Sequence, residues 1–258
     1  MYKIFLLLFV YGLAGCVDKQ ISSESEVGKS VDIPLEQKIV DKAIEVSGGD
    51  KYLNSSISFK FRDYDYIGTR KDGLFTYERI FSDNTGKIRD IYDNNGFIRE
   101  LNGKKIAVPD SMAIKYLNSI NSVFYFALLP YGLNDPAVYK AYKGLDSIDG
   151  GIYHKVEISF DEQGGGKDFD DVFLYWIDTS SFNIDYFGYT YKTDGGGARF
   201  RKAYNSRDIN GLRFQDYINY KPVDEKVTPL LKFDSLFQKQ GMTELSRIEL
   251  EEIKVEIF

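Results

Sequence analysis

IYHKVEISF, residues 152–160, alternates apolar and polar side chains. One face of this stretch carries Ile152, His154, Val156, Ile158 and Phe160, and the other carries Tyr153, Lys155, Glu157 and Ser159. A period of two predicts a β-strand with one buried face, which is typical of an antiparallel sheet. His154 lies on the apolar face, so we expect it in the core or in the wall of a cavity.

The same period extends along the chain from Ile57 in short segments that end at glycine turns. These turns are Asp72-Gly73, Asn84-Thr85-Gly86, Asn94-Asn95-Gly96, Asn102-Gly103, Asp149-Gly150-Gly151 and Asn210-Gly211. Asn-Gly and Asp-Gly readily adopt the positive φ angles of tight hairpins, so the sheet is predicted to be antiparallel and meandering. Residues 172–177 are apolar on both faces, which predicts a helix on one side and a neighbouring wall on the other. No strand-helix alternation is present that would indicate a parallel sheet, a (β/α)₈ barrel or a dinucleotide-binding fold.

Two segments show helical spacing instead. The first carries Leu35, Ile39, Ala43 and Val46 on one face and ends at Ser47-Gly48-Gly49; the second follows Asp110 and carries Ala113, Tyr116, Ile120, Val123, Phe124 and Ala127. The second helix divides the strands into two groups. We therefore predict an α+β fold over residues 35–258, a single domain in which a strongly curved antiparallel sheet is partly closed around helices.

The chain begins with MYKIFLLLFVYGLAGC, residues 1–16, in which Lys3 precedes an apolar run. This pattern predicts a signal peptide over residues 1–15, too short to stay in a bilayer as a spanning helix. Its end resembles the lipobox of bacterial lipoproteins, which implies that Cys16 is acylated and becomes the new N-terminus. Residues 16–34 are polar and serine-rich, as expected of a flexible tether. We expect a lipid-anchored protein of the cell envelope, in the outer membrane of a Gram-negative bacterium; the alternative is a secreted protein whose Cys16 is discarded.

Composition excludes several kinds of chemistry. Cys16 is the only cysteine and His154 the only histidine, so the mature chain lacks the ligands of a His- or Cys-based metal site and a thiol nucleophile. The net charge of −6 makes the chain a poor partner for nucleic acid. No P-loop, dinucleotide fingerprint or nucleophile elbow is present, so no cofactor and no metal are expected.

Two glycine triplets occur in DEQGGGKDFDD, residues 161–171, and TDGGGARF, residues 193–200. If the intervening strands form successive hairpins, both triplets lie on one rim of the sheet. Charged side chains of both signs would gather there, from Lys167, Asp168, Asp170, Asp194, Arg199 and Arg201. This rim is a candidate binding site, or else a set of loops joined by their own ion pairs.

Asp216 lies among Leu212, Phe214, Ile218 and Tyr220, on an apolar face. A carboxylate in such surroundings needs a partner or a shifted pKa, which makes it a functional candidate as well as a candidate for a structural ion pair. Aromatic side chains could line a cavity inside the curved sheet, and the candidates for its wall are His154, Trp176, Phe214 and Asp216.

Four long phrases carry a family resemblance: residues 41–56, 108–135, 164–178 and 193–222. They resemble an uncharacterised family of bacterial lipoproteins with a domain of unknown function, over nearly all of residues 36–257. The label deoxyribose-phosphate aldolase, sometimes given to such proteins, implies a (β/α)₈ barrel that this pattern does not support. The order of helix, strands, second helix and a hairpin at residues 175–189 is more loosely similar to the LolA and LolB lipoprotein carriers. That similarity implies a half-barrel with helices packed on or in its concave face, which holds acyl chains.

We therefore expect a non-enzymatic, membrane-anchored lipoprotein that binds an apolar or amphipathic, lipid-like ligand in the half-barrel. One alternative is an interaction module that binds an envelope protein through a sheet edge or the rim. Another is a hydrolase with a pair of carboxylates in one cleft, which Asp216 would have to join.

Overall fold

A computed structural model describes residues 32–163, 170–192, 195–224 and 229–258. Ile33–Phe258 form one compact unit, which contains the three hydrophobic clusters described below. Within the described residues, every helix is too short or too polar to cross a bilayer.

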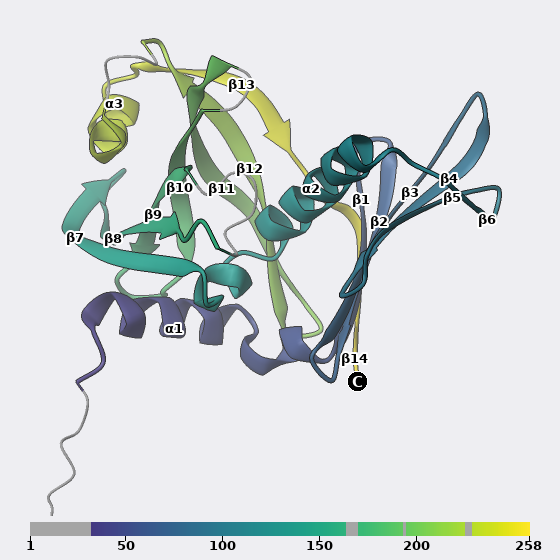
Figure 1. The fold of residues 1–258 in the computed structure, drawn as a ribbon. Coiled ribbons are helices and arrows are strands. Elements are labelled where there is room, and N and C mark those ends of the chain that lie inside the picture. Colours follow the sequence, from purple (N-terminus) through teal and green to yellow (C-terminus); the bar gives the residue numbers. More distant parts are fainter. Residues whose placement is uncertain (1–31, 164–169, 193–194, 225–228) are drawn as a thin grey trace, which may run out of the picture. The chain divides into compact units, whose positions relative to one another are not determined.

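The described strands form two antiparallel sheets of seven strands each (Figure 1). The first sheet has the order β14-β1-β2-β3-β4-β5-β6. Its strands are β1 (Ser55–Phe61), β2 (Tyr64–Lys71), β3 (Leu74–Asp83), β4 (Gly86–Asp93), β5 (Gly96–Leu101), β6 (Lys104–Ile106) and β14 (Glu251–Ile257). The second sheet has the order β13-β12-β11-β10-β9-β8-β7. Its strands are β7 (Val138–Ile148), β8 (Gly151–Phe160), β9 (Val172–Asp178), β10 (Ile184–Tyr191), β11 (Gly197–Ile209), β12 (Leu212–Pro222) and β13 (Met242–Ile248).

The glycine turns connect neighbouring strands, as predicted. At Asp72-Gly73, Asn102-Gly103, Asp149-Gly150 and Asn210-Gly211 both residues have φ between 50° and 85°. This is the conformation of a two-residue turn whose twist matches that of the strands it joins. The local sequence therefore determines most of the meander, and the predicted antiparallel sheet is confirmed.

Helix α2 (Asp110–Ala127) lies between the two sheets (Figure 1). Phe124 stacks on Tyr77 of the first sheet, with ring centroids 3.9 Å apart, and Phe126 stacks on Phe187 of the second. Gly68 makes the first contact possible, because a Cβ at this position would lie 2.6 Å from Cε1 of Phe124. The predicted second helix thus separates the two groups of strands and fills the space between them.

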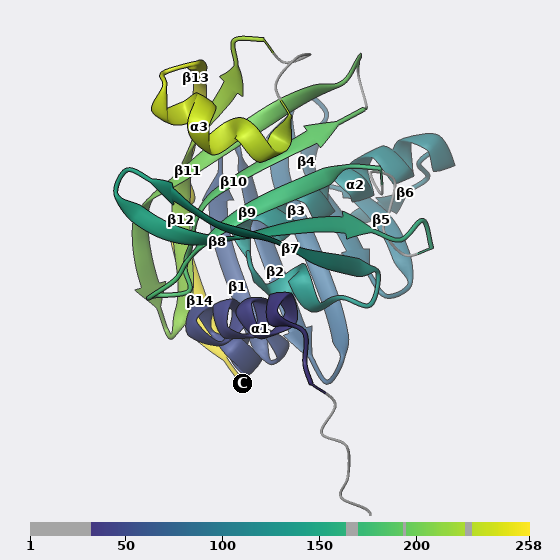
Figure 2. The ribbon, with the colours of Figure 1, turned by 90° about the vertical axis from the view of Figure 1, so that its left-hand side faces the viewer.

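The second sheet is covered on both faces. Helix α1 (Leu35–Ser47) packs Ile39, Val40 and Ala43 against the face that carries Val156 and Tyr175. The short helix α3 (Phe233–Gln238) packs Phe233 against Trp176 and Phe200 on the opposite face. Figure 2 shows the two helices on opposite sides of β7, β8 and β9. Burial on both sides accounts for the continuous apolar run of β9. Three 3₁₀ turns accompany the helices among the described residues: η1 (Gly49–Leu53), η2 (Tyr131–Asn134) and η4 (Leu230–Lys232).

The last part of the chain connects the two sheets. Strand β13 pairs with β12 in the second sheet, and β14 pairs with β1 in the first. Asp216 of β12 lies at this crossing and is 2% exposed. Its carboxylate accepts hydrogen bonds from Asn205 Nδ2 at 2.6 Å, Arg207 Nη2 at 3.0 Å and the backbone N–H of Leu250 at 3.0 Å. Asp216 therefore joins β11, β12 and the start of β14.

Candidate functional site

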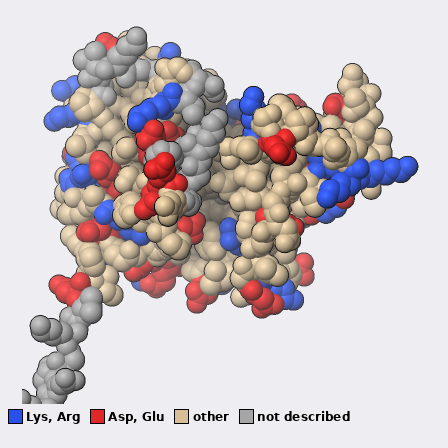
Figure 3. All heavy atoms as spheres, viewed as in Figure 1, with Lys and Arg blue, Asp and Glu red and all other residues tan. Residues whose placement is uncertain are grey.

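A cavity of about 320 Å³ lies between α2 and the second sheet. Its wall is formed by Phe61, Arg62, Ser119, Ser122, Val123, Phe126, Ala127, Arg201, Gln215, Tyr217, Asn219, Ser246, Ile248 and Leu250. These residues come from the end of β1, from α2, from β11, β12 and β13, and from the crossing into β14. In Figure 3 the surface is hollowed between the parts of the molecule built on the two sheets. The cavity is near the lower end of the range for small-molecule sites, roughly 300–1,000 Å³, so it would accommodate one modest ligand.

The helical side of the cavity follows from the helical repeat. Ser119, Ser122, Val123, Phe126 and Ala127 are spaced three and four residues apart, so they share one face of α2. Ile120 and Phe124, on the neighbouring face, are buried against the first sheet. The helix thus offers a mixed surface of hydroxyls and apolar groups to the cavity.

The strand side of the cavity is a row of polar residues. Arg201 of β11 lies directly opposite Asn219 of β12, and Asn219 lies opposite Ser246 of β13. Gln215 and Tyr217 precede Asn219 on the same face of β12, because alternate residues of a strand point the same way. The register of three strands therefore brings a guanidinium and two amides to one wall.

Three of these polar groups have an unpartnered, buried atom: Nε of Arg201, Oε1 of Gln215 and Oδ1 of Asn219. Gln215 donates from Nε2 to the Ile184 carbonyl at 2.8 Å and to the Tyr217 hydroxyl at 2.7 Å. The first bond requires the amide N–H₂ on that side, so Oε1 is the acceptor without a partner. Burial raises the pKa of the Tyr217 hydroxyl to about 12, so this group stays protonated at neutral pH and can donate a hydrogen bond.

Arg201 is 7% exposed. Within the described residues it makes one hydrogen bond, from Nη2 to the Tyr189 hydroxyl at 3.1 Å, and no ion pair. Its Cζ lies 4.1 Å from the ring centroid of Phe126 and 5.2 Å from that of Phe187. Burying a charge costs several kcal/mol, whereas a desolvated cation–π contact contributes about 2 kcal/mol and a neutral hydrogen bond about 1 kcal/mol. The charge of Arg201 is therefore only partly compensated.

The cavity wall is positively charged. It contains Arg62 and Arg201 and, among its described residues, neither Asp nor Glu. Behind the wall, Asp90 is fully buried and pairs with both Arg79 at 2.7 Å and Arg99 at 2.6 Å, so that group also carries excess positive charge. Arg79 donates from Nη1 to the Ser119 hydroxyl oxygen at 3.1 Å, which leaves the Ser119 hydrogen available to the cavity. This arrangement suits a ligand that carries negative charge.

A comparison with protein families now identifies the chain's family. The model of a family of unknown function, DUF6503, matches residues 5–250. The chain belongs to this family. The resemblance found in the sequence is thereby confirmed, and none of the curated proteins matches the chain.

Three solved structures are among those to which the chain is similar. A LolA superfamily protein from Nitrosomonas europaea is 13% identical, with a TM-score of 0.47 over 88% of this chain and 96% of that one. A domain described as an outer membrane lipoprotein-sorting protein, from Vibrio parahaemolyticus, is 8% identical, with a TM-score of 0.44 over 85% and 91%. The lipoprotein LppX from Mycobacterium tuberculosis is 11% identical, with a TM-score of 0.27 over 62% and 91%.

The four residues expected in the cavity wall lie elsewhere. A hydrogen bond of 3.2 Å joins His154 Nδ1 and the Tyr142 hydroxyl, and burial lowers the pKa of His154. Trp176 lies under α3 on the opposite face of the sheet, Phe214 belongs to the cluster beside the first sheet, and Asp216 joins the two sheets. The cavity described above is lined by their neighbours in sequence instead, such as Gln215 and Tyr217.

The six residues predicted to form the rim lie in different places. Lys167, Asp168 and Asp194 lie outside the described residues. Asp170 pairs with Lys192 at 3.3 Å, so the flanks of the two glycine loops do meet at one end of the sheet. Arg199 stacks on Tyr191, whereas Arg201 reaches the cavity. The structure thus places one of the six rim candidates in the wall of the cavity.

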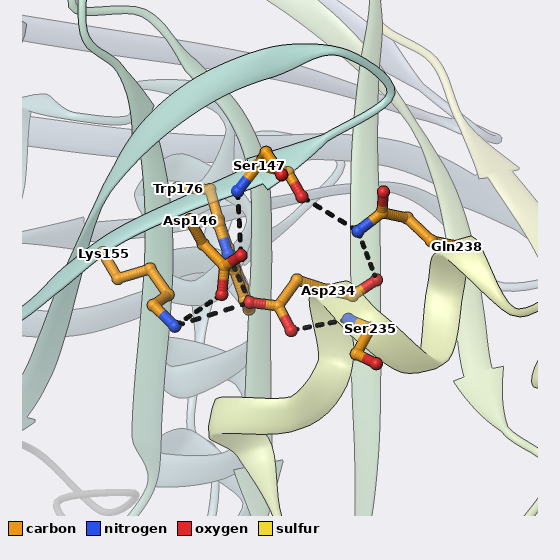
Figure 4. Close-up of polar contacts among 7 residues, drawn as sticks. All are labelled: Asp146, Ser147, Lys155, Trp176, Asp234, Ser235 and Gln238. Atoms are coloured by element: carbon orange, nitrogen blue, oxygen red, sulfur yellow. Dashed lines mark hydrogen bonds and ion pairs between the residues drawn. The ribbon is translucent and has the colours of Figure 1, made fainter.

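A pair of carboxyl groups occurs at a second position, under α3. Asp146 and Asp234 line a hollow of about 400 Å³ together with Lys155. Figure 4 shows Lys155 Nζ reaching Asp146 at 2.8 Å and Asp234 at 3.6 Å, while the Trp176 indole N–H donates to Asp234 at 3.3 Å. A hydrogen bond from Asp234 lowers the pKa of Asp146, and burial together with that bond raises the pKa of Asp234. Asp234 therefore keeps its proton to a higher pH than Asp146 does, and Asp216 is not part of this pair.

The pair has a structural role that the contacts make plain. Asp234 lies in the first turn of α3 and is 2% exposed, and the Gln238 side chain of the same helix donates to the Ser147 carbonyl at 2.9 Å (Figure 4). Asp146 and Lys155 belong to β7 and β8. These contacts hold α3 on the outer face of the second sheet.

Proposed function

We propose that this protein is a lipid-anchored protein of the cell envelope that binds one amphipathic ligand in the cavity between α2 and the second sheet. The observation that carries the proposal is the cavity itself, in which apolar side chains from the helix face a polar row on the strands. Binding sites for small amphiphiles combine an apolar lining with a few well-placed polar groups.

The size of the cavity limits the ligand. At about 320 Å³ it suits a single-chain molecule and is small for a lipid with two or three acyl chains. We therefore propose binding of a fatty-acid-sized amphiphile, not transport of a whole lipoprotein. The role is non-enzymatic: the polar groups of the wall can hold and orient a ligand.

The anchor is part of the proposal. Residues 1–16 have the pattern of a signal peptide with a lipobox, and the cavity-bearing unit begins at Ile33. Radiolabelled palmitate should enter the wild-type protein in cells and not the Cys16→Ser variant, and only the former should sediment with membranes. Equal membrane association of the two proteins would refute anchoring through Cys16.

Ligand binding is tested by filling the cavity. The unit Ile33–Phe258, which holds its own hydrophobic clusters, is titrated with a neutral naphthylamine dye whose fluorescence rises in apolar surroundings. Val123→Trp places an indole in the cavity and should abolish most of the rise. Asn121→Trp introduces the same side chain on an exposed part of α2 and should leave the rise intact. A dye that does not bind the wild type, or that binds Val123→Trp equally, refutes the proposal.

A further inference from the structure

We infer that the ligand of this cavity is an acidic amphiphile, whose anionic group pairs with Arg201 while its chain lies against α2. This inference rests on the proposed function and names the chemical class of its ligand. Arg201 is more than nine-tenths buried, lines the cavity and has an unpartnered Nε. A buried guanidinium without a carboxylate partner is rare, because its desolvation is normally offset by an ion pair.

The surroundings of Arg201 favour an anion over a neutral group. The wall contains two arginines and no acidic residue among its described members, although the whole chain has a net charge of −6. Ser119 and Tyr217 each accept a hydrogen bond from another residue, so their own O–H groups can donate to the same ligand. A planar guanidinium with two hydroxyl donors nearby matches the geometry of a carboxylate or a phosphate.

The two amide oxygens add a second requirement. Oε1 of Gln215 and Oδ1 of Asn219 are buried acceptors without partners. Both residues belong to β12, where Asn219 lies directly opposite Arg201 of β11. Buried acceptors are nearly always satisfied, so the head group also carries an O–H or N–H donor. A hydroxylated fatty acid or an N-acyl amino acid has this combination, whereas a long-chain hydrocarbon or an ester has not.

The experiment compares single-chain ligands that differ only in the head group. Dodecanoate, dodecanol and a hydroxylated dodecanoate displace the neutral naphthylamine dye from the wild-type unit Ile33–Phe258, and inorganic phosphate serves as an anion without a chain. Dodecanoate should bind about 10- to 100-fold more tightly than dodecanol, the effect expected of a charge-assisted hydrogen bond. The hydroxylated acid should bind more tightly still.

Variants assign the preference to Arg201. Arg201→Met should lose the preference for dodecanoate over dodecanol, whereas Arg201→Lys should retain part of it. Arg247→Gln removes the same charge from the outer face of β13, where Arg247 contacts Glu244, and should keep the full preference. Thermal unfolding shows whether each variant is folded. The comparison of dodecanoate with dodecanol uses the wild type alone, so it tests the inference even if a variant does not fold.

The outcomes separate the two proposals. If dye and alcohol bind but the acid has no advantage, the acidic-amphiphile inference fails and the proposed function stands. If phosphate alone displaces dodecanoate at equal concentration, the site recognises a free anion and the inference is overturned. If neither the dye nor any amphiphile binds, the proposed function itself fails.

Discussion

Replacing Asp216 by alanine tests how the two sheets are held together. Asp216→Ala removes three hydrogen bonds from a carboxylate that is 2% exposed, one from Arg207, one from Asn205 and one from the Leu250 N–H. Losing the bond to the guanidinium costs about 1.5–3 kcal/mol, and leaving a buried N–H unsatisfied costs about 1–3 kcal/mol. Removal of one member of a buried ion pair is measured at about 3–5 kcal/mol in other proteins. We expect a loss of about 3–5 kcal/mol, which lowers the melting temperature of a domain of this size by roughly 6–20 °C.

Urea unfolding of Ile33–Phe258, followed by tryptophan fluorescence and circular dichroism, measures the loss. Glu244→Ala is the control, because Glu244 forms a surface ion pair with Arg247 and its removal should cost less than about 1 kcal/mol. A double-mutant cycle with Arg207→Ala should give a coupling of at least about 1 kcal/mol between the two residues. If Asp216→Ala unfolds within 1 kcal/mol of the control, the crossing is not held by this carboxylate, and our account of the junction is wrong.

Two further predictions concern packing and pH. Gly68→Ala should lower the free energy of unfolding by about 1–3 kcal/mol, because the new Cβ would lie 2.6 Å from Cε1 of Phe124. At Gly132 the nearest atom is 3.6 Å away, so Gly132→Ala should change this free energy by less than about 0.5 kcal/mol. Equal effects of the two substitutions would refute the close contact. The raised pKa of Asp234 means that the folded state binds its proton more tightly than the unfolded state does, so the free energy of unfolding should fall as the pH rises from about 4 to that raised pKa. Asp234→Asn lacks this proton, so its stability relative to the wild type should increase over the same pH range in urea titrations; a constant difference between the two proteins would contradict the assignment.

The parts of the fold that depend on local rules could be predicted from the sequence. Each Asn-Gly or Asp-Gly turn is a property of two residues, and the helical spacing around Ile39 and Ile120 is a property of a dozen. The division into two sheets, the crossing at Leu250 and the docking of α3 depend on contacts between distant segments. Asp234 and Trp176, for example, are 58 residues apart. Helix α3 has six residues, too few for a periodic signal, and its position is set by tertiary contacts.

Arg201 shows why the site was harder to predict than the fold. The sequence places it near a glycine loop, which suggests the rim. It lies four residues beyond Gly197, the first residue of β11, and at about 3.3 Å per residue this carries it roughly 13 Å into the sheet. Charge and proximity in sequence favour a surface position, whereas the length of the strand determines the depth at which the side chain lies.

Strand β12 shows that a polar face can also be covered, which its sequence pattern does not reveal. Arg213, Gln215, Tyr217 and Asn219 form the more polar face of this strand, a pattern that ordinarily indicates a solvent-facing side. Here the face with Phe214 and Asp216 joins the sheets, and the face with Gln215 and Asn219 lines the cavity under α2, so both faces are covered by other parts of the molecule. Alternation separates the two faces of a strand, but it does not say what covers either one. A polar face that is covered must find partners, and the unpartnered atoms of Arg201, Gln215 and Asn219 are the reason for proposing that a ligand completes their environment.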